Sequence, residues 1–139
     1  MGTKFETARG TVYPWQVDHV GHMNVQFYVA RFDEASWQLL ANFGLTGSYL
    51  RDHHRGMGAL EQHTYYRREL LPGALIRVAS EVEEVKPKVV RFIHRMYDVE
   101  TGEEVASTTI TAAHMDTEAR RAVPFPDDIA ARLAAAVRA

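Results

Sequence analysis

One long stretch with helical periodicity dominates the first half of the chain and limits what the chain can fold into. Between residues 24 and 43, apolar side chains recur at steps of three and four: Val25, Tyr28, Phe32, Ala35, Leu39 and Phe43. Asn24 is a favourable N-cap, and Gly44 suits the position after the last turn. The pattern predicts a helix of about 20 residues, roughly 30 Å long at the standard rise. Its broad apolar face indicates that other elements enclose it.

Strand patterns lie on both sides of this helix. We expect residues 1–7 to be a loose lead-in and residues 11–15 to form a short strand, with Pro14 at an edge or bulge. Residues 45–58 are expected to form a polar loop. Alternation then predicts strands at 59–70, 75–85, 89–99 and 105–115, and residues 127–138 form a terminal helix. Short turns between these strands indicate an antiparallel meander.

The order of strand, long helix and strands indicates an α+β fold in a single domain, residues 1–139. We expect an antiparallel sheet of about five strands wrapped round one long helix, with a short C-terminal helix. Strands this apolar make poor exposed edges, so we also expect homo-oligomerisation.

The composition narrows the classes of function. A formal net charge of −2 gives no reason to expect binding to nucleic acid or to an anionic membrane. Cysteine is absent, which excludes disulfides, a thiolate nucleophile and a cysteine-based metal site. The first residues lack the apolar run of a signal peptide, and no segment approaches membrane-spanning length. We therefore expect a soluble, cytoplasmic protein.

The bend before the long helix concentrates the candidate chemistry. Residues 17–24 place Asp18, Gly21, His22 and Asn24 between an extended segment and the helix start. A helix N-terminus offers unpaired N–H groups and the positive end of the helix dipole, so it can polarise a carbonyl. A lone Asp before a helix is commonly a turn or cap residue. The spacing alone therefore favours a structural Asp18 over a catalytic one.

The same residues resemble the signature of a known family. The pattern Asp18-x-x-Gly21-His22-x-Asn24, followed by Tyr28 and by Phe32-Asp33-Glu34-Ala35, is similar to hotdog-fold acyl-CoA thioesterases of the 4-hydroxybenzoyl-CoA thioesterase type. The order of elements after the motif also matches, over almost the whole chain. The resemblance implies a hotdog dimer or dimer of dimers, with active sites between subunits and no metal or other cofactor. It implies that Asp18 is the catalytic carboxylate and that the Val25 backbone N–H polarises the thioester carbonyl.

Other residues near the bend have two interpretations each. His22 could orient Asp18 or the substrate, or it could bond the loop backbone. Asn24 could touch the thioester or only cap the helix. Gly21 could admit the pantetheine arm of CoA or be a plain turn glycine. Tyr28 could line the acyl pocket or belong to the core or an interface.

Candidates outside the bend lie on the predicted strands and turns. Glu61 and His63 share a strand face and could position water or a polar acyl group in a neighbouring subunit's site, or could be solvated. Residues 58–65 resemble versions seen in carnitine- and betaine-related members. Basic residues that could grip the CoA phosphates, or be plain hairpin charges, are Lys86, Lys88 and Arg91, with Arg67 and Arg68 as a second set. No acid-rich cluster completes a metal shell around the histidines, so we expect no metal.

The leading hypothesis is an acyl-CoA thioesterase that releases a carboxylic acid and free CoA, with Asp18 as nucleophile or general base. A non-catalytic hotdog protein that binds acyl-CoA is the second hypothesis, and an enoyl-CoA hydratase or dehydratase is the third. The expected partners are an acyl-CoA and further copies of the chain, as a homodimer or homotetramer. The acyl group cannot be read from the sequence.

Overall fold

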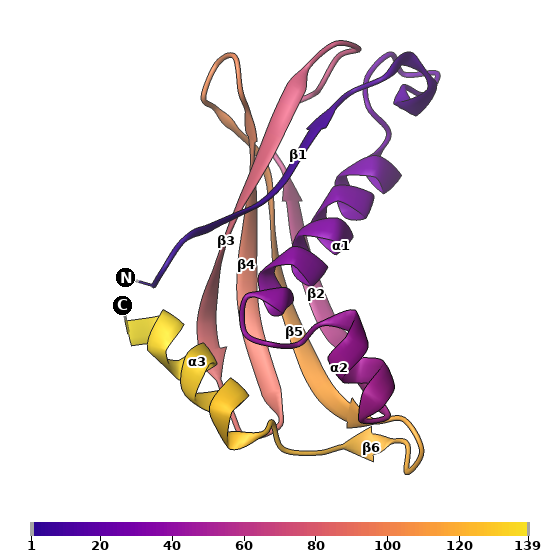
Figure 1. Cartoon of the computed structure of the whole chain (residues 1–139). Coiled ribbons are helices and arrows are strands. Elements are labelled where there is room, and N and C mark those ends of the chain that lie inside the picture. Colours follow the sequence, from indigo (N-terminus) through magenta and orange to yellow (C-terminus); the bar gives the residue numbers. More distant parts are fainter. Residues whose placement is uncertain (1, 139) are drawn as a thin grey trace.

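An antiparallel sheet curls round one long helix in the computed structural model, which describes residues 2–138 (Figure 1). The helix is α1 (Val25–Ala41), and the five main strands are β1 (Phe5–Thr11), β2 (Arg55–Tyr66), β3 (Leu75–Val85), β4 (Val89–Asp98) and β5 (Glu104–Asp116). A short strand, β6 (Arg121–Ala122), pairs with β5. The other elements are the 3-10 turn η1 (Pro14–Gln16), α2 (Gly47–Asp52) and α3 (Asp127–Arg138). The predicted α+β class, long helix and terminal helix are confirmed.

The strand order differs from the predicted meander. It runs β1-β3-β4-β5-β2, and each neighbouring pair is antiparallel. Only β3, β4 and β5 form a meander, because β2 pairs with β5 instead of β3. Residues 67–74 are a crossover that passes the start of α1, where the Met23 N–H donates to the Leu70 carbonyl at 2.8 Å. The meander prediction was wrong because Pro72-Gly73, which looks like a hairpin turn, belongs to this crossover.

Three predicted boundaries at the N-terminal side were also wrong. Residues 5–7, expected in a loose lead-in, begin β1, and Met1 lies outside the described residues. Of residues 11–15, only Thr11 is in a strand, at the end of β1, since Pro14 starts η1 and cannot donate to a ladder. The helix α1 ends at Ala41 rather than Phe43, and the chain turns away through Gly44 at φ +94°.

The predicted loop at residues 45–58 contains two elements. Thr46 caps α2 by accepting the Tyr49 N–H at 3.2 Å. β2 then starts at Arg55 and ends at Tyr66, earlier at both ends than predicted. Its glycine-containing start has weak strand propensity, but it is held by backbone pairing with the end of β5. This pairing is long-range and is not visible in the local pattern.

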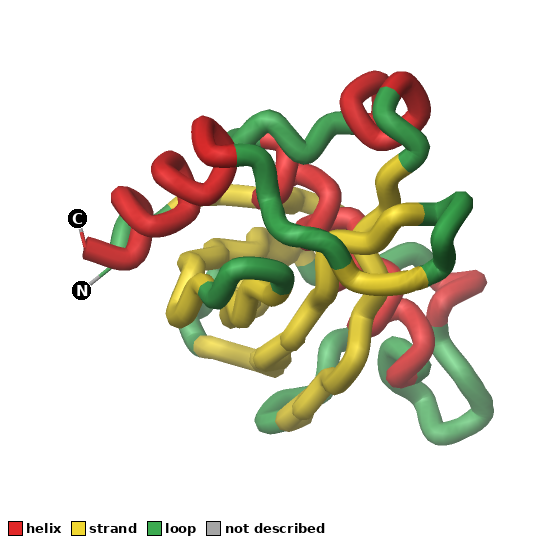
Figure 2. Tube along the Cα trace, turned by 90° about the horizontal axis from the view of Figure 1, so that it is seen from below, coloured by secondary structure: helices red, strands yellow, loops and turns green. Residues whose placement is uncertain are grey.

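The core fills the space between α1 and the concave face of the sheet. Phe32 and Ala35 of α1 are fully buried, as is Phe92 of β4. Along β4, buried and partly exposed side chains alternate, which matches a strand with one face on the core. Figure 2, a view from below, shows that the strands curl rather than form a flat layer. Enclosing α1 in this way fixes its N-terminal end relative to the crossover.

A chain of hydrogen bonds crosses this core beneath α1. His94 is fully buried, with Nδ1 bonded to the Ser80 hydroxyl and Nε2 at 2.8 Å from Ser36 Oγ. The Ser36 hydroxyl donates to the Phe32 carbonyl at 3.0 Å, so it accepts from a His94 Nε2–H. The Ser80 hydroxyl is also hydrogen-bonded to Thr7 Oγ1 at 2.7 Å. Burial lowers the pKa of His94 to about 3, so the ring is neutral.

The two ends of the described chain lie side by side (Figure 1). The Thr3 N–H donates to the Ala136 carbonyl at 2.9 Å. Within α3, Ile129, Leu133 and Ala136 are buried against the core. Among the helices of residues 2–138, none combines the length and apolarity that a membrane crossing requires.

Candidate active site

Asp18 is held from two sides in the bend before α1. Its Oδ1 accepts the Val20 N–H at 2.9 Å, and its Oδ2 accepts a hydrogen bond from Asn24 Nδ2 at 2.8 Å. An isolated bridge between Val17 and Met23 closes the bend. These bonds, the one from Asn24 foremost, lower the pKa of Asp18. The carboxylate is therefore ionised near neutral pH and fixed in orientation.

Asn24 joins this carboxylate to the helix. Its Oδ1 accepts the Gln26 N–H at 3.0 Å, while its Nδ2 donates to Asp18. Only this orientation of the amide gives each partner an opposite group, because an N–H needs an oxygen and a carboxylate needs an N–H. The predicted N-cap role of Asn24 is confirmed. The contact with Asp18 adds a second role that the sequence did not show.

Capping leaves one donor of the first helical turn free. The Gln26 N–H goes to the Asn24 side chain, and the Phe27 N–H goes to the Asn24 carbonyl at 3.0 Å. Within residues 2–138, the Val25 N–H has no acceptor. Val25 as a whole residue is 54% exposed, and it lines a pocket. An unpaired N–H at the positive end of a helix is suited to an oxygen that gains negative charge.

Val25 lines a pocket between the start of α1 and the crossover. His22 and Tyr28 lie on the helix side of this pocket, and Arg68 and Glu69 lie on the crossover side. His22 Nε2 is 3.7 Å from Glu69 Oε1. The Tyr28 hydroxyl donates to the Arg68 carbonyl at 2.9 Å, and burial raises the pKa of Tyr28 to about 12, so it stays protonated. Neither Asp18 nor Asn24 is on the pocket wall, but Asn24 binds Asp18 and is the residue before Val25, which lines the pocket.

The structure brings six of the predicted site residues together at this end of the molecule: Asp18, Gly21, His22, Asn24, Val25 and Tyr28. Gly21 has φ +99°, and no other atom lies within 4 Å of the place where a Cβ would be. Glycine is therefore favoured there by the backbone conformation and not by close packing. Its N–H donates to the Asp18 carbonyl at 3.0 Å.

Glu61 and His63 lie on the face of β2 that points away from α1. Gln62, between them, lines a pocket beside α1, and neighbouring side chains on a strand point to opposite faces. Within one chain these two residues do not approach Asp18. A role for them at the site depends on a second copy of the chain.

Lys86, Lys88 and Arg91 surround the turn between β3 and β4. That turn lies at the opposite end of the sheet from the bend, because the other end of β3 pairs with the end of β1 that leads into it. Arg91 forms ion pairs with Glu83 at 3.5 Å and Glu84 at 3.3 Å. The basic residues on the pocket beside Val25 are instead Arg67 and Arg68. Sequence spacing ranked these two second because the crossover was not foreseen.

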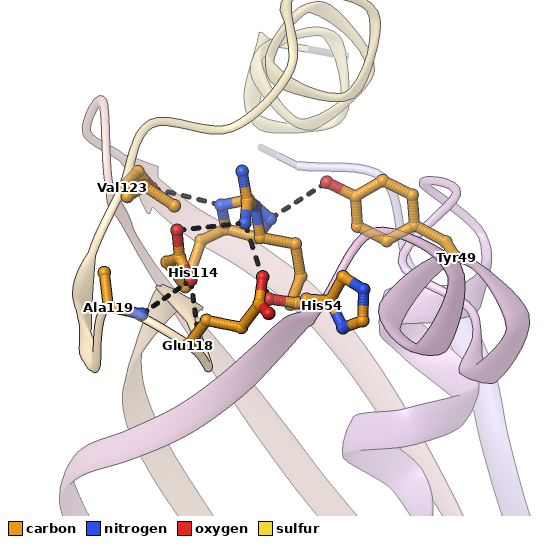
Figure 3. A network of polar contacts seen from close by, with 8 residues as sticks. Tyr49, His54, His114, Glu118, Ala119 and Val123 are labelled. Carbon is orange, nitrogen blue, oxygen red and sulfur yellow. Dashed lines mark hydrogen bonds and ion pairs between the residues drawn. The ribbon is translucent and has the colours of Figure 1, made fainter.

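A second polar cluster lies at the far end, between α2 and the end of β5 (Figure 3). The buried His114 ring donates from Nδ1 to the Val123 carbonyl at 3.1 Å, so its Nε2 accepts from the Tyr49 hydroxyl at 3.0 Å. Nearby, Arg55 pairs with Asp116 at 3.3 Å. This cluster ties α2 to the sheet and is remote from Asp18. Across residues 2–138 no three His, Asp or Glu side chains are grouped as a metal site.

Known proteins match both the sequence and this geometry. The profile of a family described as the thioesterase-like superfamily matches residues 12–133, which include the bend, α1 and all strands after β1. The chain belongs to the thioesterase-like superfamily. This membership confirms the predicted hotdog fold and the predicted class of enzyme, an acyl-CoA thioester hydrolase. The match is to the broad superfamily and not to the narrower 4-hydroxybenzoyl-CoA type.

Individual members of the superfamily are similar over most of the chain. Betainyl-CoA thioesterase of Pseudomonas aeruginosa is 27% identical over 137 residues, 99% of this chain and 84% of that protein. L-carnitine dehydrogenase/betainyl-CoA thioesterase of Agrobacterium fabrum is 31% identical over 110 residues, 79% of this chain but only 22% of that longer protein. A hypothetical protein of Staphylococcus aureus, solved in complex with CoA, superposes with a TM-score of 0.91 over 99% of this chain and 86% of that one. At 20% identity, this last likeness shows the fold alone.

Proposed function

We propose that this thioesterase-like protein hydrolyses an acyl-CoA, with Asp18 as the reacting carboxylate and the Val25 N–H as the oxyanion donor. The observation that carries the proposal is the double contact of Asn24, which binds Asp18 and caps α1 while the adjoining Val25 N–H stays unpaired. An ionised oxygen and a free donor thus lie on either side of one residue. The Asp18 carboxylate can react at the carbonyl carbon of a thioester, and the Val25 N–H can donate a hydrogen bond to the carbonyl oxygen.

The reaction can start in two ways from this arrangement. In the first, Asp18 attacks the carbonyl carbon, the CoA thiolate leaves, and water then hydrolyses the mixed anhydride. In the second, Asp18 takes a proton from a water that attacks the carbonyl carbon, and the CoA thiolate leaves. In both cases the carbonyl oxygen gains charge facing the Val25 N–H and the positive end of α1. Arg67 and Arg68, on the same pocket, are placed for the phosphate-bearing part of CoA.

We also propose that two copies of the chain pair through β2. This strand lies at one end of the sheet order, and Leu60, Tyr65 and Tyr66 on it are 63%, 58% and 46% exposed. Long apolar edges are seldom left open, and pairing about a two-fold axis would cover this one. Antiparallel pairing sets the Arg55 end of one copy beside the Tyr66 end of the other. Lys86 and Lys88 of a second copy, which lie at its Arg55 end, would then approach the first copy's site.

Relatives guide the choice of substrates for a first assay. Two of the proteins similar to this chain are named for betainyl-CoA hydrolysis. A panel should therefore include betainyl-CoA beside neutral short-chain, aryl and medium-chain acyl-CoAs.

Release of free thiol from this panel, with the wild type and Asp18→Asn, tests the function. We predict release by the wild type and a fall in kcat on the order of 1000-fold in Asp18→Asn, as for loss of a catalytic carboxylate, with CoA affinity retained. Asp98→Asn is the matched control, because Asp98 also accepts two backbone N–H groups in a turn but is neither in the bend nor on the pocket beside Val25. Thiol release by Asp18→Asn near the wild-type rate would refute the role of Asp18. CoA binding without thiol release would favour the hypothesis of a non-catalytic binding protein. Hydration of an enoyl-CoA would favour the hypothesis of a hydratase.

A further inference from the structure

A second pocket begins one helical turn beyond Val25. It lies between α1 and the β2 side of the sheet, and its helix wall includes Val29, Asp33 and Trp37. Met57 of β2 and Phe92 of β4 form part of the opposite wall. Val25, Val29, Asp33 and Trp37 follow at four-residue steps, so they lie along one face of α1 that leads from the free N–H to this pocket.

Asp33 is the one formally charged side chain on the wall of this pocket. Its basic neighbour on the helix, Arg31, pairs with Glu34 at 3.2 Å. Within residues 2–138, no Lys, Arg or His forms an ion pair with Asp33. Asp33 is an exposed residue, so its charge acts on a ligand in this pocket through screened forces that oppose an anion and attract a cation.

Trp37 follows Asp33 by four residues, so the indole and the carboxylate share one face of α1. Indole is the strongest partner for a cation above an aromatic face. Val29, Met57 and Phe92 add apolar surface around these two groups. The Asp33 carboxylate, the face of the Trp37 indole and the apolar walls can together bind a cation that has no N–H groups to donate.

Of the neutral polar side chains on the wall, Ser36 offers no donor to an acyl group. The proton of Ser36 is already used, since its hydroxyl donates to the Phe32 carbonyl and accepts from His94. Gln62 is the other neutral polar residue. Ser36 therefore has no proton left to donate to an acyl group, whereas the Gln62 amide can still donate and accept.

We propose that this pocket binds an acyl group that ends in a quaternary ammonium, with Asp33 as its counter-charge and Trp37 as its aromatic face. The proposal rests on the proposed function, because it takes the thioester to lie at Val25. Eight residues of helix separate Val25 from Asp33, about 12 Å along the axis, and helical side chains lean back toward the N-terminus. Substrates of two chain lengths therefore test how far from the carbonyl the cation must lie.

Pairs of substrates with equal shape but different charge test this proposal. Betainyl-CoA and tert-butylacetyl-CoA differ only in having nitrogen or carbon at the branch point, and a second pair, each longer by two methylene groups, extends the reach. We expect the wild type to prefer the cation by about tenfold or more in kcat/KM in at least one pair. Asp33→Asn should remove this preference by slowing the cationic substrate, with the neutral one changed by less than about threefold. Glu34→Gln is the control, because Glu34 is the next residue on α1 but is not on this pocket.

Titration of the same pairs into Asp18→Asn separates this inference from the proposed function. We expect Asp18→Asn to bind the cationic member of a pair more tightly than the neutral one, and the Asp18→Asn, Asp33→Asn double variant to lose this preference. This result supports the proposed pocket even if no substrate is hydrolysed. Equal binding and equal turnover of both members of each pair overturn the inference while leaving the thioesterase proposal intact. An equal fall in kcat/KM for the cationic and the neutral member of a pair in Asp33→Asn also overturns the inference.

Discussion

Asn24 donates one hydrogen bond to Asp18 and accepts another from Gln26, so a single side chain sets both the carboxylate and the helix start. The cap could be predicted, because Asn before an apolar period is a local signal. The contact with Asp18 could not, because it depends on the bridge between Val17 and Met23 that folds the bend back on itself. The same holds for the bond between His94 and Ser36, which are far apart in the sequence.

Replacing Asn24 by Ser separates its two roles. Serine is also a good N-cap, but its shorter side chain cannot keep the contact with Asp18. We expect kcat to fall by about 10- to 100-fold, the range for a lost bond to a charged group, with KM little changed. Because the Asn24 bond is the foremost cause of the lowered Asp18 pKa, the acid limb of the kcat/KM profile should move to higher pH.

The pH profile and thermal melting of this variant distinguish positioning from stability. Asn24→Ala, which also loses the cap, should be destabilised by about 1 kcal/mol, whereas Asn24→Ser should melt near the wild type. An unchanged acid limb and kcat in Asn24→Ser would show that the contact with Asp18 has no part in the reaction.

Among the elements, those defined by local periodicity were predicted best. Residues 75–85 and 127–138 match β3 and α3, and the long helix is shorter than predicted only at its end. The place of β2 could not be predicted, since its partner β5 is chosen by packing across α1 and not by the turn that follows it. The crossover that results carries Arg68 and Glu69 to the site, so an error in strand order also hid part of the pocket.

The free edge of β2 makes a prediction about assembly. Leu60→Asp would place two like charges near each other across a two-fold β2 pairing, so we expect the dimer to weaken by at least about tenfold. Light scattering after size exclusion, over a range of concentrations, measures the change. Val99→Asp is the control, because Val99 is an exposed apolar residue in the turn between β4 and β5. A dimer that is unaffected by Leu60→Asp, or a monomeric wild type, would contradict pairing through β2.

For the molecule as a whole, two buried histidines couple folding to pH. Burial lowers the pKa of both His94 and His114, and to about 3 for His94. Below the ordinary histidine pKa of about 6.5, the unfolded chain binds a proton at each position that the folded chain does not. Stability should therefore fall as the pH drops from about 6.5 toward 3.

Urea unfolding at two pH values measures this linkage. His94 alone should lower the free energy of unfolding by about 2 kcal/mol between pH 7 and pH 5. Imidazole NMR signals should show a neutral His94 ring in the folded protein at pH 5. Equal stability at both values, or a folded-state His94 that titrates near 6.5, would contradict this prediction.

The most direct test of the central claim removes the Val25 N–H and little else. Proline lacks this donor but is well tolerated as the first residue of a helix, and the extended conformation of Asn24, φ −65° and ψ 144°, suits the residue before a proline. Val25→Ala keeps the donor and is the matched control. We predict that kcat for thiol release falls about 100- to 1000-fold in Val25→Pro relative to Val25→Ala, while both melt near the wild type. Equal kcat values in the two variants would show that the start of α1 does not stabilise the thioester oxygen.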